Sequence, residues 1–475
     1  MDLIGLQHSS TSTRPGLEAS PLRRVYGIRL LYRARTRRLI AFTLAGITAI
    51  GYIVMGSVQL ATLPRTDLKW DWVQFRAAAV ALNHGLNPYA SFLKLCPGTQ
   101  WCQGGYIFPP LLAEVLRPLA SLSTTAGAAV WLLASHAMFI AAVIVTWRAV
   151  RDLVSPAAQA ALLALTLGFL PLYVSLSFLQ VGTLLLLLLA LAASAQMRRP
   201  AAEARAGAWV GVAAVLRVSP VLLAPALAWT TRREGRPRWH WRGLATMLVT
   251  GVAVLGGLAL LTGFTWTYFT DVLPRIGGGT PNLDNQSLPA VVERAYALWA
   301  PGVSPPATLI GAVAAVLTLV PTWLLWQRAL ATRGDTPAVR ALGFAAMLAA
   351  LPIASNITWQ HHLILEVLVF ALLAANLAVC ARPGRLAPGH GAATWLAVAA
   401  YPLMWSDRHI TDAIVLFLHL DNPTGWRVAP FLLLTAWNLA GMVCLWAACL
   451  VVMRQSGQGR DAVDGDAVPV VDRLE

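Results

Sequence analysis

Residues 71–89 read DWVQFRAAAVALNHGLNPY and carry a short helical pattern inside a very apolar chain. Apolar side chains recur with the spacing of one helix face: Phe75, Ala78, Ala79 and Leu82. Gly85 offers a helix C-cap, and Asn87-Pro88-Tyr89 predicts a turn. A helix of about three turns cannot span a bilayer, which needs about 20 apolar residues. We therefore expect it on a membrane surface or against other helices, with Asp71 at its start.

The rest of the chain has the composition of a polytopic membrane protein. Of 475 residues, 57% are hydrophobic and 12% are charged, and apolar runs of about 20 residues recur. The net charge is +15, but Lys and Arg stand in short connections beside the apolar runs. This positive-inside pattern attributes the charge to membrane topology and anionic lipids rather than to nucleic acid.

Three regions are predicted. Residues 1–37 form a basic cytoplasmic arm without the features of a cleavable signal peptide. Residues 38–453 form the all-α membrane domain, and its first outer loop, 62–125, contains Asp71 and a second surface helix at 111–122. Residues 454–475 form a disordered cytoplasmic tail.

About ten full spans are expected from hydropathy and from the basic connections. They cover 39–61, 126–149, 157–176, 184–195, 243–261, 306–326, 339–354, 362–379, 392–405 and a last run ending at 453. The run 207–229 differs, because basic residues flank both ends and Arg217 and Pro220 interrupt its middle. We expect a re-entrant hairpin of two half-helices with Arg217 near the tip.

On this topology polar residues from distant segments meet at the outer face: Asp71, Gln180, Arg217, Asn285-Gln286-Ser287 and His361-His362. Each also has a structural interpretation. Asp71 with Gln74 fits a capping box, Gln180 can tie off a tight hairpin, and Arg217 can form a salt bridge within the bundle. Asn285-Gln286-Ser287 matches a glycosylation sequon, and the adjacent histidines can be interfacial residues without chemistry. The two histidines point about 100° apart on a helix, which disfavours a metal site, although a divalent cation remains open as a cofactor.

Together these residues suit transfer of a sugar from a phosphate. A carboxylate can take a proton from a sugar hydroxyl while cationic side chains stabilise the departing phosphate. The chain has no Gly-rich loop of the kind that cradles the phosphates of a nucleotide.

The same segments resemble glycosyltransferase family 87. The resemblance covers about residues 39–450 and rests on motifs that occur in this order: Asp71-Trp72, Asn87-Pro88-Tyr89, Phe108-Pro109-Pro110, Gln180-Val181-Gly182, Arg217-Val218-Ser219-Pro220, Asn285-Gln286-Ser287-Leu288 with Arg294, and Ser355 to Trp359 with His361-His362. The chain departs from the family pattern at Leu179 and Gly182, where Gly and Asn are usual, at Arg217 for Lys, and at Phe108 for Tyr.

The resemblance implies a GT-C fold and a function in bacterial envelopes. Its members resemble polyprenyl-phosphate-mannose-dependent α-1,2-mannosyltransferases of phosphatidylinositol mannoside and lipomannan synthesis. It implies Asp71 as general base, with inversion at the sugar, and the other catalytic residues, His361 and His362, are expected to serve the donor phosphate. It also implies a donor site of Gln180, Arg217, Asn285, Gln286 and Arg294, and an acceptor site at Asn87 and Tyr89. The partners are then the donor lipid, a glycolipid acceptor and the bilayer, with the site on the outer face of the plasma membrane.

Two other functions remain open at this stage. An arabinofuranosyltransferase that uses polyprenyl-phosphoarabinose would share the acidic loop, and a lipid or sugar transporter would also gather polar residues near broken helices. Because the first loop is expected in an oxidising compartment, Cys96 and Cys102 are expected to form a disulfide.

Overall fold

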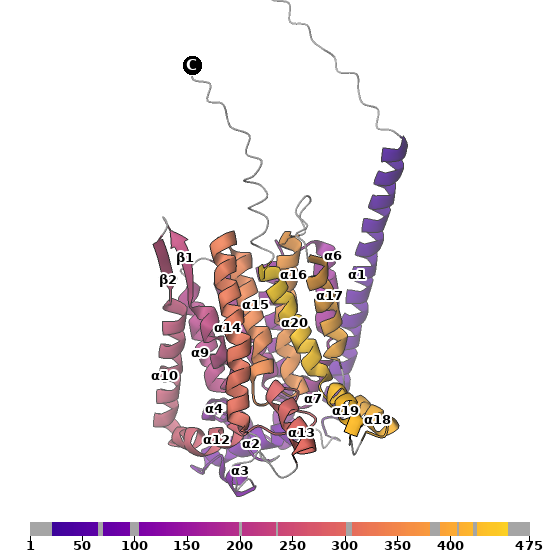
Figure 1. The fold of residues 1–475 in the computed structure, drawn as a ribbon. Helices are drawn as coiled ribbons and strands as arrows, with labels where there is room; N and C mark the ends of the chain where they lie inside the picture. Colours follow the sequence, from indigo (N-terminus) through magenta and orange to yellow (C-terminus); the bar gives the residue numbers. More distant parts are fainter. Residues whose placement is uncertain are drawn as a thin grey trace, which may run out of the picture.

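The structure is a computed structural model, and it describes residues 21–64, 70–95, 104–198, 202–233, 236–300, 306–380, 390–405, 408–420 and 425–454. Long helices run side by side through the molecule, and short helices gather at one end of the bundle (Figure 1). The expectations for residues 1–20, the tail 455–475 and the Cys96–Cys102 disulfide lie outside the described residues. The first helix begins at Pro21, so residues 21–37 are helical and continuous with the first span.

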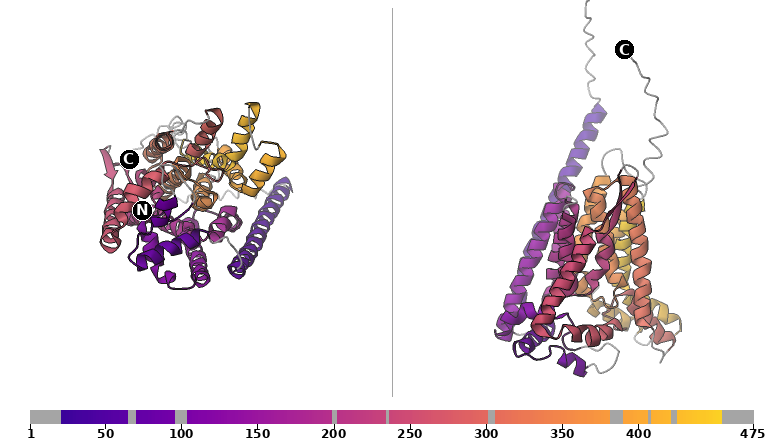
Figure 2. Two further views of the ribbon diagram at one scale, coloured as in Figure 1. Left: turned by 90° about the horizontal axis from the view of Figure 1, so that it is seen from below. Right: turned by 90° about the vertical axis from the view of Figure 1, so that its left-hand side faces the viewer.

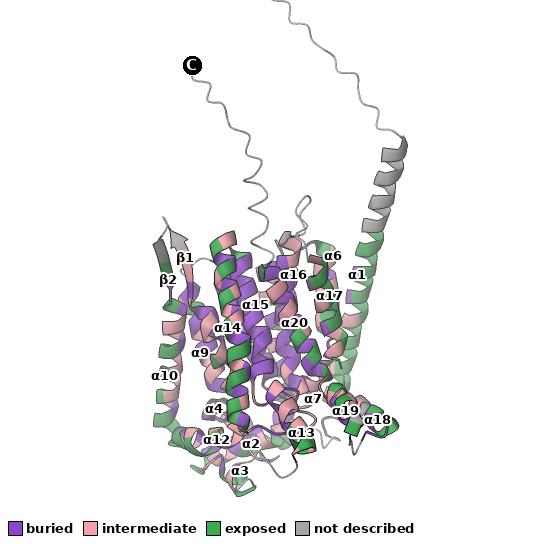
Figure 3. Cartoon of the chain, viewed as in Figure 1, coloured by how far each residue is buried: buried purple, intermediate pink, exposed green. Residues whose placement is uncertain are grey.

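Seven described stretches are long and apolar enough to cross a membrane. They belong to α1 (Pro21–Thr62), α5 (Thr124–Val150), α10 (Arg242–Thr262), α14 (Ala307–Arg333), α15 (Pro337–Ala354), η4 with α16 (Gln360–Leu365 and Glu366–Cys380) and α20 (Trp437–Arg454). The chain is therefore a multi-pass membrane protein. α15 lies in the core, whereas the outer helices α1 and α10 expose most of their apolar surface, as a lipid environment requires (Figure 3).

Three further apolar segments are shorter: α6 with α7 (Pro156–Leu167 and Leu170–Ser177), α8 (Gly182–Met197) and α17 (His390–Leu403). The run 157–176, expected as one span, bends by 40° between α6 and α7. Pro171 lacks an N–H and its ring would clash with the preceding turn, so the helix breaks before it. The bend lets α7 lie at the end of the bundle where the short helices gather (Figure 1).

The segment predicted as a hairpin consists of α9 (Glu203–Leu216) and the 3₁₀ helix η2 (Ser219–Leu227). A Cβ built on Gly243, at the start of α10, would lie 3.3 Å from the carbonyl oxygen of Glu203 and 3.2 Å from that of Leu227. Both ends of the segment therefore lie at the same end of the bundle. Its second half is 3₁₀ rather than α-helical, because Pro220 and Pro225 remove backbone donors that an α-helix needs.

A two-stranded antiparallel sheet follows, which an all-α prediction missed. It pairs β1 (Trp229–Arg233) with β2 (Arg236–His240) at the end opposite the short helices (Figure 1). His240 Nδ1 lies 2.7 Å from Glu203 Oε1 and its Nε2 lies 3.0 Å from the Thr231 hydroxyl. The Trp229 indole stacks on the same imidazole, and these contacts hold the hairpin onto α9.

The short helices at the other end face the viewer in the left view of Figure 2. They are α2 (Trp70–Asn83), α3 (Ala90–Leu95), α4 (Pro110–Ala120), α11 (Thr265–Thr267), the π-helix η3 (Tyr268–Val272), α12 (Leu273–Gly277), α13 (Leu288–Trp299), α18 (Arg408–Phe417), the 3₁₀ turn η5 (Gly425–Arg427) and α19 (Val428–Thr435). The two predicted surface helices are α2 and α4, which pack on each other. Gly85 ends α2 in the left-handed region, with φ of 67°, as its position predicted.

Candidate active site

A cavity of about 1130 Å³ lies at the end of the bundle where the short helices gather. Six polar side chains that line it come from α2, the α7–α8 turn, the α9–η2 break, η3 and η4: Asp71, Gln180, Arg217, Tyr268, His361 and His362. Residues separated by more than 200 positions in the sequence thus face one space. The size and mixed lining are those of a substrate site.

Asp71 lies in the first turn of α2, which begins at Trp70. Its Oδ2 accepts a hydrogen bond of 2.5 Å from the side-chain amide of Gln180. Burial raises the pKa of Asp71 to about 6, although the Gln180 bond acts in the opposite direction. Asp71 is thus a helix residue facing the cavity rather than the N-cap of a capping box, and its carboxylate suits a general base near neutral pH.

The turn that presents Gln180 is tightly constrained. Leu179 has a φ of 56°, a left-handed conformation that is strained for a residue with a branched side chain. The Trp131 indole donates a hydrogen bond of 2.8 Å to the Leu179 carbonyl. A Cβ on Gly182 would lie 2.7 Å from Ser175 Oγ, so a larger residue there would have to displace the Ser175 side chain. Gln180 therefore holds the carboxylate of Asp71 as well as lining the cavity.

Arg217 and His362 form a second polar pair. Arg217 Nη2 lies 2.8 Å from His362 Nδ1, and the Trp359 N–H donates to the same nitrogen at 3.0 Å. A nitrogen that accepts from two donors carries no proton, so the neutral ring has its hydrogen on Nε2. The rings of His361 and His362 pack edge to face with their centroids 4.3 Å apart. This contact fixes both rings beside Arg217.

Arg217 reaches this place because its helix ends there. Its backbone is extended, with φ of −155° and ψ of 130°, and the chain then turns into η2. Burying a guanidinium at this depth is unfavourable unless it meets polar groups or an anionic ligand. The break in the predicted hairpin therefore places a cation on the wall of the cavity.

Sequence reasoning missed Tyr268, a buried residue of η3 that lines the cavity. Burial raises the pKa of its phenol, and the nearby Arg217 lowers it in part, so the group stays a neutral donor. The sequence places this segment in an outer loop, where a single tyrosine gives no signal. Further lining residues outside the predicted set are Gln74, Asp284, Asn356, Trp359 and Asp412.

Asn285 and Arg294, both expected to bind the donor, form hydrogen bonds with the backbone beside the cavity. The Asn285 amide donates to the carbonyls of Thr280 and Asn356, at 3.0 and 2.9 Å, and its oxygen accepts from the Thr358 N–H. Arg294 donates to three backbone carbonyls: Asn282, Asn285 and Thr435. Neither of these two side chains lines the cavity.

Gln286, the residue after Asn285, does line the cavity. Its side-chain amide donates 2.6 Å to the Leu283 carbonyl, and its backbone N–H donates to the Thr358 carbonyl. Within the described part of the chain its Oε1 has no hydrogen-bond partner although it is buried. Gln286 therefore contributes a buried acceptor beside the cavity whose hydrogen-bonding capacity is unused within the described residues.

Asn87 and Tyr89, expected at the acceptor, lie outside the cavity lining. Asn87 Oδ1 accepts from the Tyr89 N–H at 2.9 Å, which closes the turn after α2. The buried Tyr89 hydroxyl donates to the Phe108 carbonyl at 3.0 Å, and Phe108 lines the cavity. The motif thus supports the cavity wall from behind.

Among the described residues, no group of three or more His, Cys, Asp or Glu side chains is arranged to hold a metal ion. The Asp71 carboxylate shares the cavity with a cation paired with an imidazole, Arg217 with His362. This combination suits an anionic leaving group and a hydroxyl nucleophile.

The sequence model of glycosyltransferase family 87 matches residues 106–355, more than half of the 475-residue chain. The matched part contains Gln180, Arg217 and Tyr268, whereas Asp71 and the two histidines lie outside it and join them through the fold. No curated protein and no solved structure matches the chain. The extent of the family match shows that this multi-pass membrane protein belongs to glycosyltransferase family 87 and is a membrane glycosyltransferase.

Proposed function

We propose that the protein transfers a mannosyl group from a polyprenyl-phosphate-mannose donor to a hydroxyl of a cell-envelope glycolipid or lipoglycan, forming an α-1,2 linkage with inversion. The observation that carries this proposal is the shared cavity. It brings the Asp71 carboxylate into the same space as the Arg217–His362 pair. A base and an anion-binding pair are the two groups that such a transfer needs.

In the proposed reaction Asp71 accepts the proton of the acceptor hydroxyl. The hydroxyl oxygen forms a bond to C1 of the sugar while the bond from C1 to the phosphate oxygen breaks. The electron pair of that bond leaves with the polyprenyl phosphate. Attack opposite the leaving group converts a β-linked donor into an α-glycoside.

The leaving phosphate gains negative charge, and Arg217 and the Nε2–H of His362 supply the positive charge and a hydrogen-bond donor. His361 and Tyr268 complete this wall. Gln180 holds the base, and Gln286 Oε1 accepts from a sugar hydroxyl. Asn285 and Arg294 contribute indirectly, because their hydrogen bonds to backbone carbonyls hold the loops that form the cavity wall.

The proposal also assigns an orientation. The end that carries Asp71 faces the outside of the bacterial plasma membrane, and the β1–β2 end with its basic run faces the cytoplasm, as the positive-inside rule requires. The chain then crosses about ten times, with the α9–η2 hairpin re-entrant, in a GT-C arrangement. Both termini lie in the cytoplasm.

The test uses purified protein in detergent micelles, where no transmembrane gradient exists. Labelled polyprenyl-phosphate-mannose and labelled polyprenyl-phosphoarabinose are each supplied with a glycolipid fraction from bacterial envelopes. The proposal expects a labelled glycolipid from the mannose donor, cleaved by an α-mannosidase, and none from Asp71→Asn. Labelling from the arabinose donor alone would identify an arabinofuranosyltransferase instead.

A further inference from the structure

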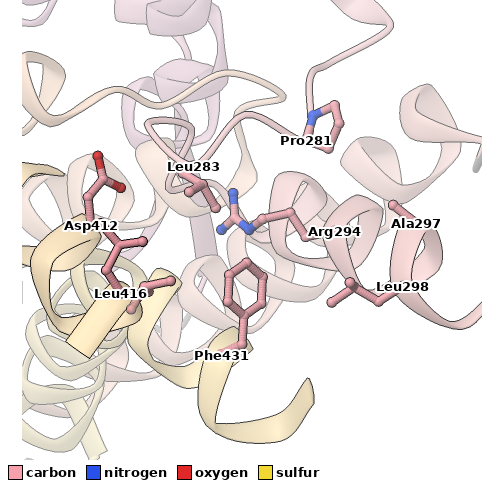
Figure 4. Close-up of a pocket in the computed structure, with 9 residues that line it drawn as sticks. Pro281, Leu283, Arg294, Ala297, Leu298, Asp412, Leu416 and Phe431 are labelled. Carbon is pink, nitrogen blue, oxygen red and sulfur yellow. The ribbon is translucent and has the colours of Figure 1, made fainter. Parts of the chain in front are cut away.

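A second hollow lies beside the cavity at the same end of the bundle. It encloses about 500 Å³ and is formed by the loop before α13, by α13 itself, and by α18 and α19 (Figure 4). Leu283 and Asp412 line both hollows, so the two share a wall. We call this second hollow the lateral groove.

The lateral groove is mostly apolar. Apart from Arg294 and Asp412, its lining residues are hydrocarbon side chains, with Leu298 of α13, Leu416 of α18 and Phe431 of α19 from three different helices. Figure 4 shows the Arg294 guanidinium between Leu283 and Phe431. Because Arg294 is tied to three backbone carbonyls, the groove has a fixed wall rather than a collapsible one.

The groove is lined in part by α18, a helix with the features of a membrane-interface helix. α18 is strongly amphipathic in its sequence, RHITDAIVLF. Phe417 at its end is 82% exposed and the following Leu418 is 47% exposed. Apolar side chains this exposed need contact with lipid, so α18 is expected to lie in the headgroup region with its apolar side toward the bilayer. The groove thus lies between the bilayer surface and the cavity.

The donor lipid has a different path available. Its chain is bonded to the phosphate, and the phosphate is assigned to Arg217. The cavity wall that follows Arg217 is apolar, with Val221 and Leu222 from η2 and Ala315 from the facing part of α14. A polyprenyl chain leaving the phosphate meets this wall first, on elements that take no part in the lateral groove.

We propose that the lateral groove binds the lipid chain of the acceptor while its sugar head enters the cavity. The inference rests on the proposed function, since it needs an acceptor with both a sugar and an apolar chain. The apolar lining, the wall shared with the cavity at Leu283 and Asp412, and the neighbouring interfacial helix select this occupant. The acceptor is therefore a glycolipid held by its chain as well as by its sugar.

The kinetic test compares two probes, hexadecyl α-mannoside and methyl α-mannoside, in proteoliposomes of the full-length protein. Ala297 lines the groove and is exposed, so Ala297→Trp fills it from the side of α13. We expect about a tenfold rise in the KM of the hexadecyl probe, equivalent to about 1.4 kcal/mol. The KM values of the methyl probe and of the donor should not change.

Two further variants make that result specific. Leu416→Ala removes apolar contact without adding bulk, and it should raise the KM of the hexadecyl probe to a smaller extent. Ala90→Trp, an exposed position on α3 at the same end of the bundle, is the matched control and should behave as wild type. An equal rise for both probes, or no rise in either groove variant, overturns the proposal.

A binding test separates this inference from the proposed function. Hexadecyl mannoside with a diazirine in its chain is photolysed with the protein, and labelled peptides are identified by mass spectrometry. Labelling of peptides within 283–298 and 412–431 that is lost in Ala297→Trp supports the groove, and labelling confined to other helices overturns it. If labelling appears while no mannosyl transfer occurs with any acceptor, the proposed function fails and the groove stands.

Discussion

The carboxylate of Asp71 is kept in a place that is unfavourable for its charge. Its pKa is about 6 in the folded protein, above its ordinary value, because burial disfavours the ionised form. Folding therefore favours the protonated acid, and stability decreases as pH rises from the ordinary pKa through about 6. A group held at such a cost fits a functional role better than a structural one.

Asp71→Asn is the first prediction at the residue scale. The amide cannot accept a proton, so transfer should fall by about 10²–10⁴-fold. Because the variant carries no buried charge, its melting temperature at pH 8 should equal or exceed that of wild type. Mannosyl transfer and thermal unfolding in detergent measure the two effects. Asp152→Asn, an exposed position at the other end of the bundle, is the control. Wild-type activity in Asp71→Asn would rule out the general base.

The Gln180 bond predicts a pH effect. The proposed mechanism needs ionised Asp71 as its base, so kcat/KM should rise with pH through about 6 in wild type. The amide of Gln180 stabilises the charged form, and its removal in Gln180→Leu should move this rise to higher pH. The rate loss is then larger at pH 6 than at pH 8. Gln159→Leu, whose side chain bonds the Arg151 carbonyl far from the cavity, should leave the profile unchanged. A loss independent of pH would limit Gln180 to a packing role.

Arg217 predicts a graded series. Arg217→Ala removes the charge and should lower kcat/KM for the donor by about 10²–10³-fold. Arg217→Lys keeps the charge but loses the planar fork that reaches His362, so a smaller loss is expected. Arg151→Ala, an exposed arginine outside the site, is the control. Equal losses in both variants, at equal membrane levels, would mean that geometry rather than charge determines the effect.

At the scale of elements, the α9–η2 hairpin depends on close packing of α9 against α10. A Cβ on Gly207 would lie 1.9 Å from the Gly243 carbonyl oxygen, and one on Gly211 would lie 2.7 Å from that of Met247. Two glycines four residues apart let the helix backbones approach, as in other membrane helix pairs. This contact fixes α9, and α9 in turn fixes the depth of Arg217.

Gly207→Ala tests this contact. The added methyl group has no space, so unfolding should become easier by about 1–3 kcal/mol and transfer should decrease with it. Gly256→Ala is matched to it, because Gly256 lies on α10 and no described residue of another element comes within 4 Å of the place that its methyl group would take. That change should be neutral or stabilising, since alanine favours helix. Melting temperatures in one detergent compare the two. An unchanged melting temperature in Gly207→Ala would contradict the close packing.

At the scale of the whole molecule, the proposed orientation places the cavity on the outer face of the membrane, and cysteine labelling tests it. Arg205 of α9 and Arg238 of β2 lie at the end opposite the cavity, and Ala90 of α3 is exposed at the cavity end. Single cysteines at these three positions, with native cysteines removed, are treated with a membrane-impermeant maleimide in intact cells. The Ala90 site should label at once, and the other two only after permeabilisation.

Two labelling outcomes would contradict the proposed orientation. Opposite behaviour of the Arg205 and Arg238 sites would mean that the intervening segment crosses the membrane. The reverse of the expected pattern at all three sites would place the cavity in the cytoplasm. Either outcome overturns the proposed orientation, whereas the fold of the hairpin itself rests on the contacts of Gly243.

The sequence alone determined the features that depend on local signals. Helix periodicity and Gly85 predicted α2 and its end, and apolar length predicted the long helices. Arg217 and Pro220 between basic flanks predicted a segment that returns to its own end. These signals act within a few residues or follow from the free energy of transferring apolar side chains from water into the bilayer. They can therefore be recognised without knowing which segments meet in the fold.

Only the tertiary structure decided which side chains share a site and which ones brace it. Gln180 meets Asp71 across 109 positions, and Arg217 meets His362 across 145. Asn285 and Arg294 have N–H groups that could bind a ligand, but these groups donate to nearby backbone carbonyls. Tyr268 lines the cavity although its segment has no recognisable motif. A polar side chain binds whichever partner the packed helices bring within about 3 Å, and that choice is absent from the residue types themselves.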